Sequence, residues 1–203
     1  MSVKKMFLIA SMALAAIAVA APVAAQANVQ LTANGVPLKD KAPVTATSKN
    51  LVTTVGTSGV TLECAEVVLH YTVATKGNGP THVTLNPTVA HNATTVGCVT
   101  NVPGVGKFPN TISNAGAGLL TINTWGTGSA AATFTTNTPA LGRHCTYTGN
   151  IPVQATNGTN TLHVETPNSL HPHEESCETG EMHGFFHVTS AGVPVIANIT
   201  ATP

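Results

Sequence analysis

The segment 163–187 holds the side chains of this chain that are best suited to binding a metal ion. It contains five of the nine histidines and five of the eight acidic residues of the sequence. Imidazole and carboxylate groups together form the usual ligand set for Zn²⁺ or Cu²⁺. His171 and His173 flank Pro172, and both rings could reach one ion if the backbone there is extended. The candidate metal ligands are His171, His173, Glu174, His183 and His187.

A loop without a cofactor is the alternative interpretation of the same segment. Polar loops commonly carry His and Glu side chains that stay solvated, and Cys177 would tether such a loop to the rest of the domain. We expect this His/Glu-rich loop over residues 165–183. The residue types leave both interpretations open.

Signatures of catalysis are missing from the sequence. There is no G-x-S-x-G motif for a nucleophile, and Asp40 is the only aspartate. No closely spaced pair of carboxylates indicates a glycosidase, and Gly104-Val105-Gly106 is not followed by a helix pattern that would cradle a phosphate. A Ser-His-Glu triad is spatial and stays open. We therefore expect no enzymatic activity and name no catalytic residue.

The first 27 residues have the pattern of a secretory signal peptide. Lys4 and Lys5 precede an uncharged apolar run, Met6 to Ala20, and Ala25-Gln26-Ala27 fits the small-residue cleavage motif. We expect cleavage before Asn28 and a secreted, extracellular or periplasmic protein. No later apolar run is long enough to span a bilayer, so we expect no transmembrane segment after cleavage.

The charge of the chain is low and nearly balanced. Only 8% of the residues are charged, and without Lys4 and Lys5 the eight basic side chains become six, against eight acidic ones. There is no basic patch, so nucleic acid is not an expected partner. The polarity comes instead from Thr, Asn, Ser and Gly, as in many extracellular β proteins.

Four cysteines in an exported chain indicate two disulfides. Of the possible pairings we favour Cys64–Cys98 and Cys145–Cys177, because each closes a short loop. The rival interpretation is a metal site built from four thiolates, but the sequence has no C-x-x-C pair.

The stretch Val60–Val73 predicts the central strand of the fold. Val60, Leu62 and Cys64 alternate with more polar residues, whereas the apolar phase flips after Glu66. We therefore predict a β-bulge near Ala65–Glu66. With about nine short strands and no amphipathic helix, the fold class is all-β, an antiparallel β-sandwich or Greek-key barrel.

A hairpin is predicted around Asn157-Gly158. A two-residue type I′ turn there would pair Val153 with Leu162 and Ile151 with Val164, which places apolar residues on one face.

The mature chain fits one domain with an N-terminal extension. We expect residues 28–50 to form an arm or edge strand and residues 51–203 to form a single β-sandwich domain. Weakly charged, Thr-rich strands are able to pair edge to edge. The expected partners are therefore a second copy of the chain, in filaments, or components of the cell surface.

One short pattern carries a family resemblance. Thr45-Ala46-Thr47, Leu51 and Gly59-Val60-Thr61-Leu62 followed by Cys64 resemble the start of small exported bacterial proteins known as activators of alkane oxidation. The likeness covers mainly Pro43–Val73. It implies a secreted accessory role in hydrocarbon use and no catalytic residue.

Two functions follow from the sequence as expectations. The first is a secreted, non-catalytic β-sandwich protein of the cell surface or extracellular matrix, either self-associating or an accessory in hydrocarbon use. The second is an extracellular or periplasmic protein that binds Zn or Cu through the His/Glu-rich segment; the first needs no cofactor.

Overall fold

The computed structural model describes residues 28–200, so the expected signal peptide lies outside the described residues. Strands take up most of this range, and its only helical element is the 3₁₀ turn η2 (Pro139–Leu141). The abundant Val and Thr explain this, because β-branched side chains pack well on a pleated surface. The strands are β1 (Asn28–Ala33), β2 (Val36–Pro37), β3 (Pro43–Val55), β4 (Val60–Asn78), β5 (His82–Pro87), β6 (Ala93–Val102), β7 (Gly106–Pro109), β8 (Thr111–Ala117), β9 (Leu120–Asn123), β10 (Thr127–Thr138), β11 (Arg143–Ala155), β12 (Thr161–Pro172), β13 (Gly180–Ser190) and β14 (Val193–Thr200).

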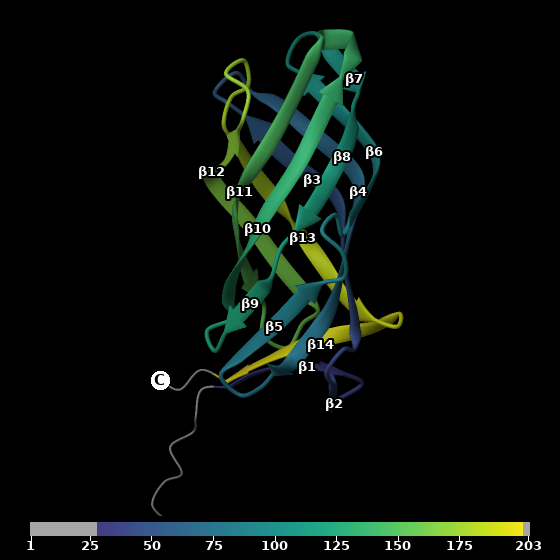
Figure 1. The fold of residues 1–203 in the computed structure, drawn as a ribbon, viewed down its shortest axis with the longest axis vertical. Coiled ribbons are helices and arrows are strands. Elements are labelled where there is room, and N and C mark those ends of the chain that lie inside the picture. Colours follow the sequence, from purple (N-terminus) through teal and green to yellow (C-terminus); the bar gives the residue numbers. More distant parts are fainter. Residues whose placement is uncertain (1–27, 201–203) are drawn as a thin grey trace, which may run out of the picture.

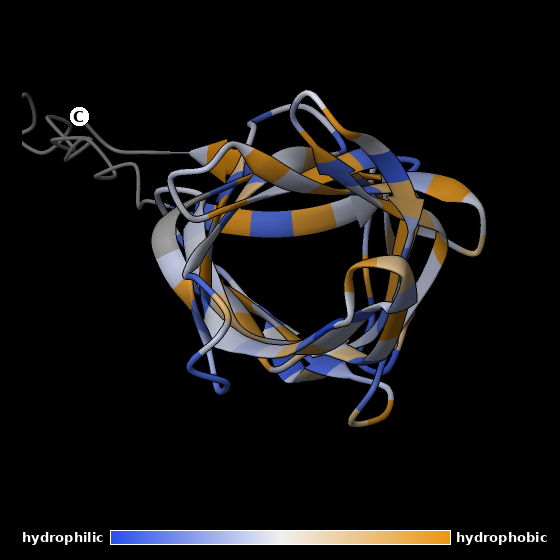
Figure 2. Cartoon of the chain, turned by 90° about the horizontal axis from the view of Figure 1, so that it is seen from above, coloured by the Kyte–Doolittle hydropathy of each residue, from blue (hydrophilic) through white to orange (hydrophobic). Residues whose placement is uncertain are grey.

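Eight of these strands close into a barrel (Figures 1 and 2). The order around the ring is β3-β4-β5-β9-β10-β11-β12-β13, and β13 pairs with β3 to complete it. All recorded pairings are antiparallel. The all-β antiparallel class is confirmed, and of the two predicted architectures the structure has a barrel; the sandwich and the count of about nine strands are wrong. A sandwich leaves sheet edges at its sides, and the β3–β13 pairing removes them.

Two groups of strands lie outside the ring order. β6, β7 and β8 form an excursion between β5 and β9, in which β6 pairs with β4 and β8 pairs with β10. β1 pairs with β14 at the lower end of the barrel (Figure 1). Buried Val29 and Val195 from this pair belong to the same core as Val83 and Ile122 of the ring, so the lower end is packed.

The predicted change of face in β4 is present and is shared by its two neighbours. Cys64 and Val67 are both buried although three positions separate them. The register on either side of Ala65 is continuous, and the residues opposite it, Asn50 in β3 and Gly97 in β6, have φ of 60° and 61°. The predicted β-bulge at Ala65–Glu66 is therefore wrong, because β4 has no extra residue there relative to β3 or β6. Three adjacent strands therefore change face together.

The hairpin around Asn157-Gly158 forms, but its register differs from the prediction. Val153 pairs with Val164 instead of Leu162, which makes the loop longer than a two-residue turn. The physical reason is that β14 uses the loop backbone: the Gly158 N–H donates to the Ala197 carbonyl, and the Ala197 N–H donates to Thr159. The shift is by two residues, so the same side chains still face inward.

Two predicted segment boundaries change. Of the stretch 28–50, β1 and β2 lie at one end of the sheet, but residues from 43 onward belong to ring strand β3. The prediction of a loop over residues 165–183 is wrong, because β12 and β13 occupy most of this range and leave only residues 173–179 as a loop. These strands form because Leu162, Val164, Met182 and Phe186 alternate inward.

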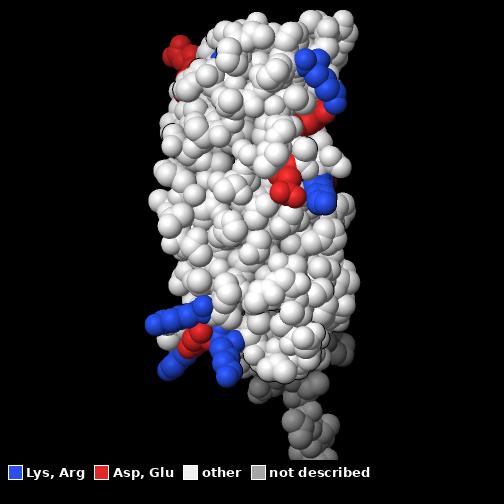
Figure 3. Space-filling model, turned by 90° about the vertical axis from the view of Figure 1, so that its right-hand side faces the viewer, with Lys and Arg blue, Asp and Glu red and all other residues white. Residues whose placement is uncertain are grey.

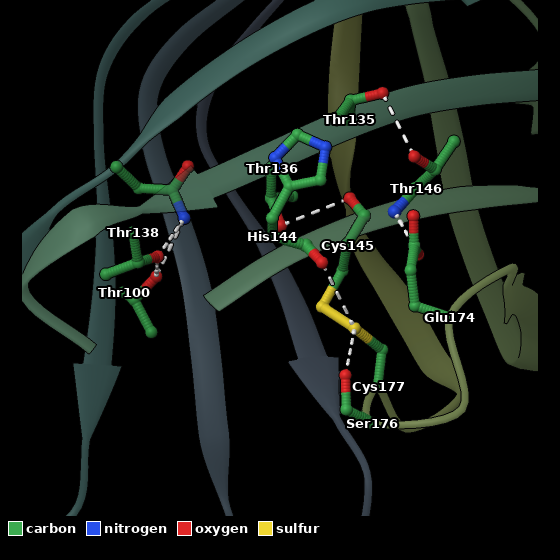
Figure 4. The surroundings of a disulfide bond; sticks show 11 residues. Thr100, Thr135, Thr136, Thr138, His144, Cys145, Thr146, Glu174, Ser176 and Cys177 are labelled. Atoms are coloured by element: carbon green, nitrogen blue, oxygen red, sulfur yellow. Dashed lines mark hydrogen bonds between the residues drawn. A yellow bond between two sulfur atoms is a disulfide. The ribbon is translucent and has the colours of Figure 1, made fainter. Parts of the chain in front are cut away.

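Both disulfides connect as the sequence analysis favoured. Cys64–Cys98 joins paired positions of β4 and β6, with a Cα–Cα distance of 4.0 Å. Cys145–Cys177 ties the 173–179 loop to β11 (Figure 4). No described cysteine is free.

Gly97 offers a test of the shared change of face. A Cβ at this position would lie 3.0 Å from the Ala65 Cβ, on a backbone with positive φ. We expect Gly97→Ala to destabilise the fold by about 1–3 kcal/mol, from left-handed strain plus crowding. Gly104→Ala is the matched control, because Gly104 has φ +74° but open space around its Cα. Denaturant unfolding measures both, and an equal cost for the two would contradict the packing argument.

Candidate functional site

The interior of the barrel contains a cavity of about 110 Å³. Its walls come from ring strands β3, β4 and β9–β13 and from β6 and β8. Aliphatic and aromatic side chains make most of the lining, among them Leu62, Val67, Phe134, Leu162 and Phe186. Among the described residues that line it there is no charged residue and no histidine. This interior is suited to an apolar occupant.

Small residues at inward positions leave this space open. An eight-stranded barrel is just wide enough for large side chains to fill it, or for one small ligand. Here β10 directs Ala130 and Ala132 inward, and β3 and β8 contribute Ala46 and Ala117. Each alanine replaces a side chain that would otherwise reach toward the barrel axis. The cavity is therefore a consequence of where alanine falls in the alternation of the strands.

A buried polar cluster fixes the barrel near the β10–β11 turn. The Asn110 Nδ2 donates to Thr100 Oγ1 at 2.8 Å and to Thr138 Oγ1 at 2.6 Å. The two threonine hydroxyls lie 2.8 Å apart and connect β6 to β10 (Figure 4). All three side chains are buried. Together with the Cys145–Cys177 bridge, this cluster holds the upper end of the molecule.

Both tyrosines of the chain are buried inside the barrel, and Tyr71 lines the cavity. Burial raises the pKa of Tyr71 to about 12, offset in part by a hydrogen bond with Asn92. Burial likewise raises the pKa of Tyr147 to about 12. Tyr147 stacks on Phe134, with ring centroids 5.3 Å apart. The phenols report an interior that disfavours charge.

The candidate metal ligands lie on the outer side of the barrel, away from the cavity lining. His171 and His187 are exposed on β12 and β13. His173 Nε2 lies 3.1 Å from Thr148 Oγ1, and His183 Nε2 lies 3.5 Å from Glu181 Oε2. Within residues 28–200, no three His, Cys, Asp or Glu side chains come together in a way that could hold a metal ion.

Glu174 has a structural partner. The Thr146 N–H donates to Glu174 Oε2 at 2.6 Å, and this bond lowers the pKa of Glu174 (Figure 4). The His173 N–H donates to the Thr146 carbonyl at 2.9 Å. These contacts continue the edge of β11 beyond Pro172, where β12 ends. The His/Glu-rich segment thus docks its loop beside the disulfide.

The cavity was missed by sequence reasoning. On β10, Ala130, Ala132 and Phe134 alternate inward, but the small residues that share their space come from β3 and β8. Strands distant in sequence create the volume, so no local pattern shows it.

Comparisons with known proteins returned nothing that bears on this site. No family model, no curated protein and no solved structure matches the chain. In residues 28–200, no helix has the length and apolar character needed to cross a bilayer. The two disulfides are compatible with an extracellular location.

The titration of the two tyrosines tests whether the barrel interior excludes water. Their folded-state pKa of about 12 lies above the ordinary value of about 10. The phenols therefore stabilise the fold fully below pH 10, and this contribution is lost as the pH rises through about 12. We expect tyrosinate absorbance of the native protein to appear only near pH 12 and that of the protein in denaturant near pH 10. A titration midpoint near pH 10 in the native protein would show that the phenols are exposed to water, and it would contradict their burial.

Proposed function

We propose that this protein is a non-catalytic binding protein that acts outside the cytoplasm and holds a small apolar molecule inside its barrel. The observation that carries the proposal is the cavity of about 110 Å³ with its uncharged lining. An apolar cavity of about 150 Å³ in another protein stays dry and takes benzene or xenon. The space here is somewhat smaller and chemically similar, so it suits molecules of that size class.

The polar groups in the lining support binding in preference to chemistry. They are hydroxyls, such as those of Thr53 and Thr95, and the phenol of Tyr71. General acid–base or nucleophilic catalysis at neutral pH needs a carboxylate, imidazole, amine or free thiol close to the substrate. Cys64 lines the cavity but is bonded to Cys98. The site therefore has the groups to enclose a ligand.

An accessory role in hydrocarbon use is one setting in which such a protein would work. An apolar molecule dissolves poorly in water, and transfer into a preformed apolar cavity is favourable by roughly 25 cal/mol for each Å² of apolar surface removed from water. A secreted barrel would then carry or present the molecule to another component. The two disulfides would keep the barrel closed in an oxidising compartment.

Strand addition between copies has less support. The ring has no free edge; outside it, β8 and residues 93–98 of β6 each have one unpaired side, where they face each other, and the described sheet ends at β2 and β7. Both of these strands are short, and each ends in a proline, Pro37 and Pro109. Proline at an edge cannot donate a ladder hydrogen bond and is a common device against pairing.

Cavity filling tests the proposed function. We expect benzene, at 100 times its Kd, to stabilise the wild-type protein by about 2.7 kcal/mol in denaturant unfolding. Ala132→Leu should abolish this stabilisation, because Ala132 lines the cavity and is buried. Ala131→Leu is the matched control, since Ala131 is the next residue on β10 and is exposed. It should leave the stabilisation intact.

Two outcomes would contradict the proposal. The first is a wild-type protein whose stability is unchanged by saturating benzene and by xenon. The second is a stabilisation that Ala132→Leu and Ala131→Leu reduce equally, because this would place the ligand outside the barrel. If Ala132→Leu overpacks the core and fails to fold, Ala130→Val makes a smaller change to the same wall.

A further inference from the structure

The wall of the barrel has one seam at which two neighbouring strands are not paired. Residues 93–98 of β6 face residues 111–117 of β8, and no ladder joins the two strands in the described part of the chain. β6 is paired on its other side with β4, and β8 on its other side with β10. We call this gap the β6/β8 seam. It gives each strand one row of backbone groups without ladder partners.

Two buried asparagines fasten the ends of the seam. At one end the Asn92 Nδ2 donates to the His70 carbonyl at 3.0 Å, and its Oδ1 accepts from the Ala117 N–H at 2.8 Å. At the other end the Asn110 N–H donates to the Cys98 carbonyl at 3.0 Å. β6 and β8 are therefore joined at both ends of the seam, and between these two points no ladder of backbone hydrogen bonds connects them.

The seam leads into the cavity. Seven residues of the cavity lining are half-buried, and four of them, Ala93, Thr95, Ile112 and Ala115, belong to the strands of the seam. A fifth, Leu69 on β4, pairs with Ala93. The remaining lining residues, apart from Thr133 and Val153, are buried. The lining thus reaches solvent mainly between β6 and β8, while β1 and β14 cover the lower end.

The surroundings of the seam carry little charge. Figure 3 shows the side of the barrel that carries β4 and β6; charged side chains gather toward its ends and along one flank, with an uncharged surface between. No residue of β6 from 93 to 98 or of β8 is charged. The nearest titratable side chains are Glu66, which pairs with Val96 from β4, and His91, whose Nδ1 lies 3.2 Å from the Asn114 carbonyl oxygen. A carboxylate held between the two strands would lose water and would find no lysine or arginine on either of them, which is costly. A neutral ligand would meet no such penalty.

We propose that the barrel takes the end of a neutral alkyl chain, which enters through the β6/β8 seam, and that it rejects the corresponding carboxylate. The inference rests on the proposed function and adds to it the ligand's charge state and its route. The cavity holds only a short part of a chain, so the remainder of a longer molecule lies in the seam. There the unpaired backbone groups of β6 and β8 can meet a hydroxyl.

A matched pair of probes tests the charge state. 1-Hexanol and hexanoate have the same number of carbons and differ in their head group. We expect 1-hexanol to shift the NMR signals of cavity methyl groups such as those of Val67 and Leu162, and hexanoate at pH 7 to bind about 100-fold more weakly or not at all. Hexanoate binding should recover as the pH falls through roughly 4–5, where the carboxyl group becomes neutral. Equal binding of both at pH 7 overturns the inference.

A blocking variant tests the route. Thr95 lies in the seam and lines the cavity, whereas its neighbour Thr94 is exposed. We expect Thr95→Trp to slow the association of 1-hexanol about tenfold or more and to weaken its binding, because the indole fills the seam through which the chain enters and in which its head group lies. Thr94→Trp is the matched control and should exchange like the wild type. NMR exchange measurements give both rate constants.

The outcomes separate this inference from the proposed function. If Thr95→Trp exchanges 1-hexanol as fast as Thr94→Trp, the ligand uses another route and the inference fails while the binding function stands. If neither benzene nor 1-hexanol affects the wild-type protein, the binding function itself fails.

Discussion

The pairing of β3 with β13 is the interaction on which the rest of the structure depends. It joins a strand from the first third of the chain to one near its end, from Thr45 opposite Thr189 to Val55 opposite Gly180. Without it the ring would be an open sheet with two long edges and an apolar face exposed to water. With it, the inward face of every ring strand meets the others across the barrel axis. Closure therefore creates both the core and the cavity.

Large side chains fill part of the barrel interior, and small side chains leave the rest of it open. Phe134, Tyr147 and Phe186 are buried and occupy much of the barrel, and the lower end is packed under β1 and β14. Alanines on β3, β8 and β10 withhold the side chains that would complete the packing. A void of this kind costs dispersion contacts along its lining, and a ligand of suitable shape restores them. In the proposed binding, the ligand makes the dispersion contacts that the cavity lining otherwise lacks.

The His/Glu-rich segment has a different role from the one its composition indicated. Its two strands contribute Leu162, Val164, Met182 and Phe186 to the barrel interior, so the histidines between them alternate outward. Its loop is held by Cys177 and by the bond from the Thr146 N–H to Glu174. The period of two in a strand therefore separates this segment into an inward apolar set and an outward polar set.

Several features were determined by the sequence by itself. The all-β class, both disulfide pairings and the change of face near Ala65 followed from residue types, cysteine spacing and local alternation, which act over short stretches of chain. The hairpin at Asn157-Gly158 was also local, but its register was not, because β14 forms hydrogen bonds with the loop backbone.

Tertiary structure alone decided what the alternation encloses. The same alternation of inward side chains fits two facing sheets or one closed ring. The choice depends on whether β13 pairs with β3, which is distant from it in sequence. The cavity and the β6/β8 seam follow from that choice, since each is bounded by strands that are distant in sequence. Local propensity acts within a strand, whereas volume and closure are properties of how strands meet, so only the folded chain fixes them.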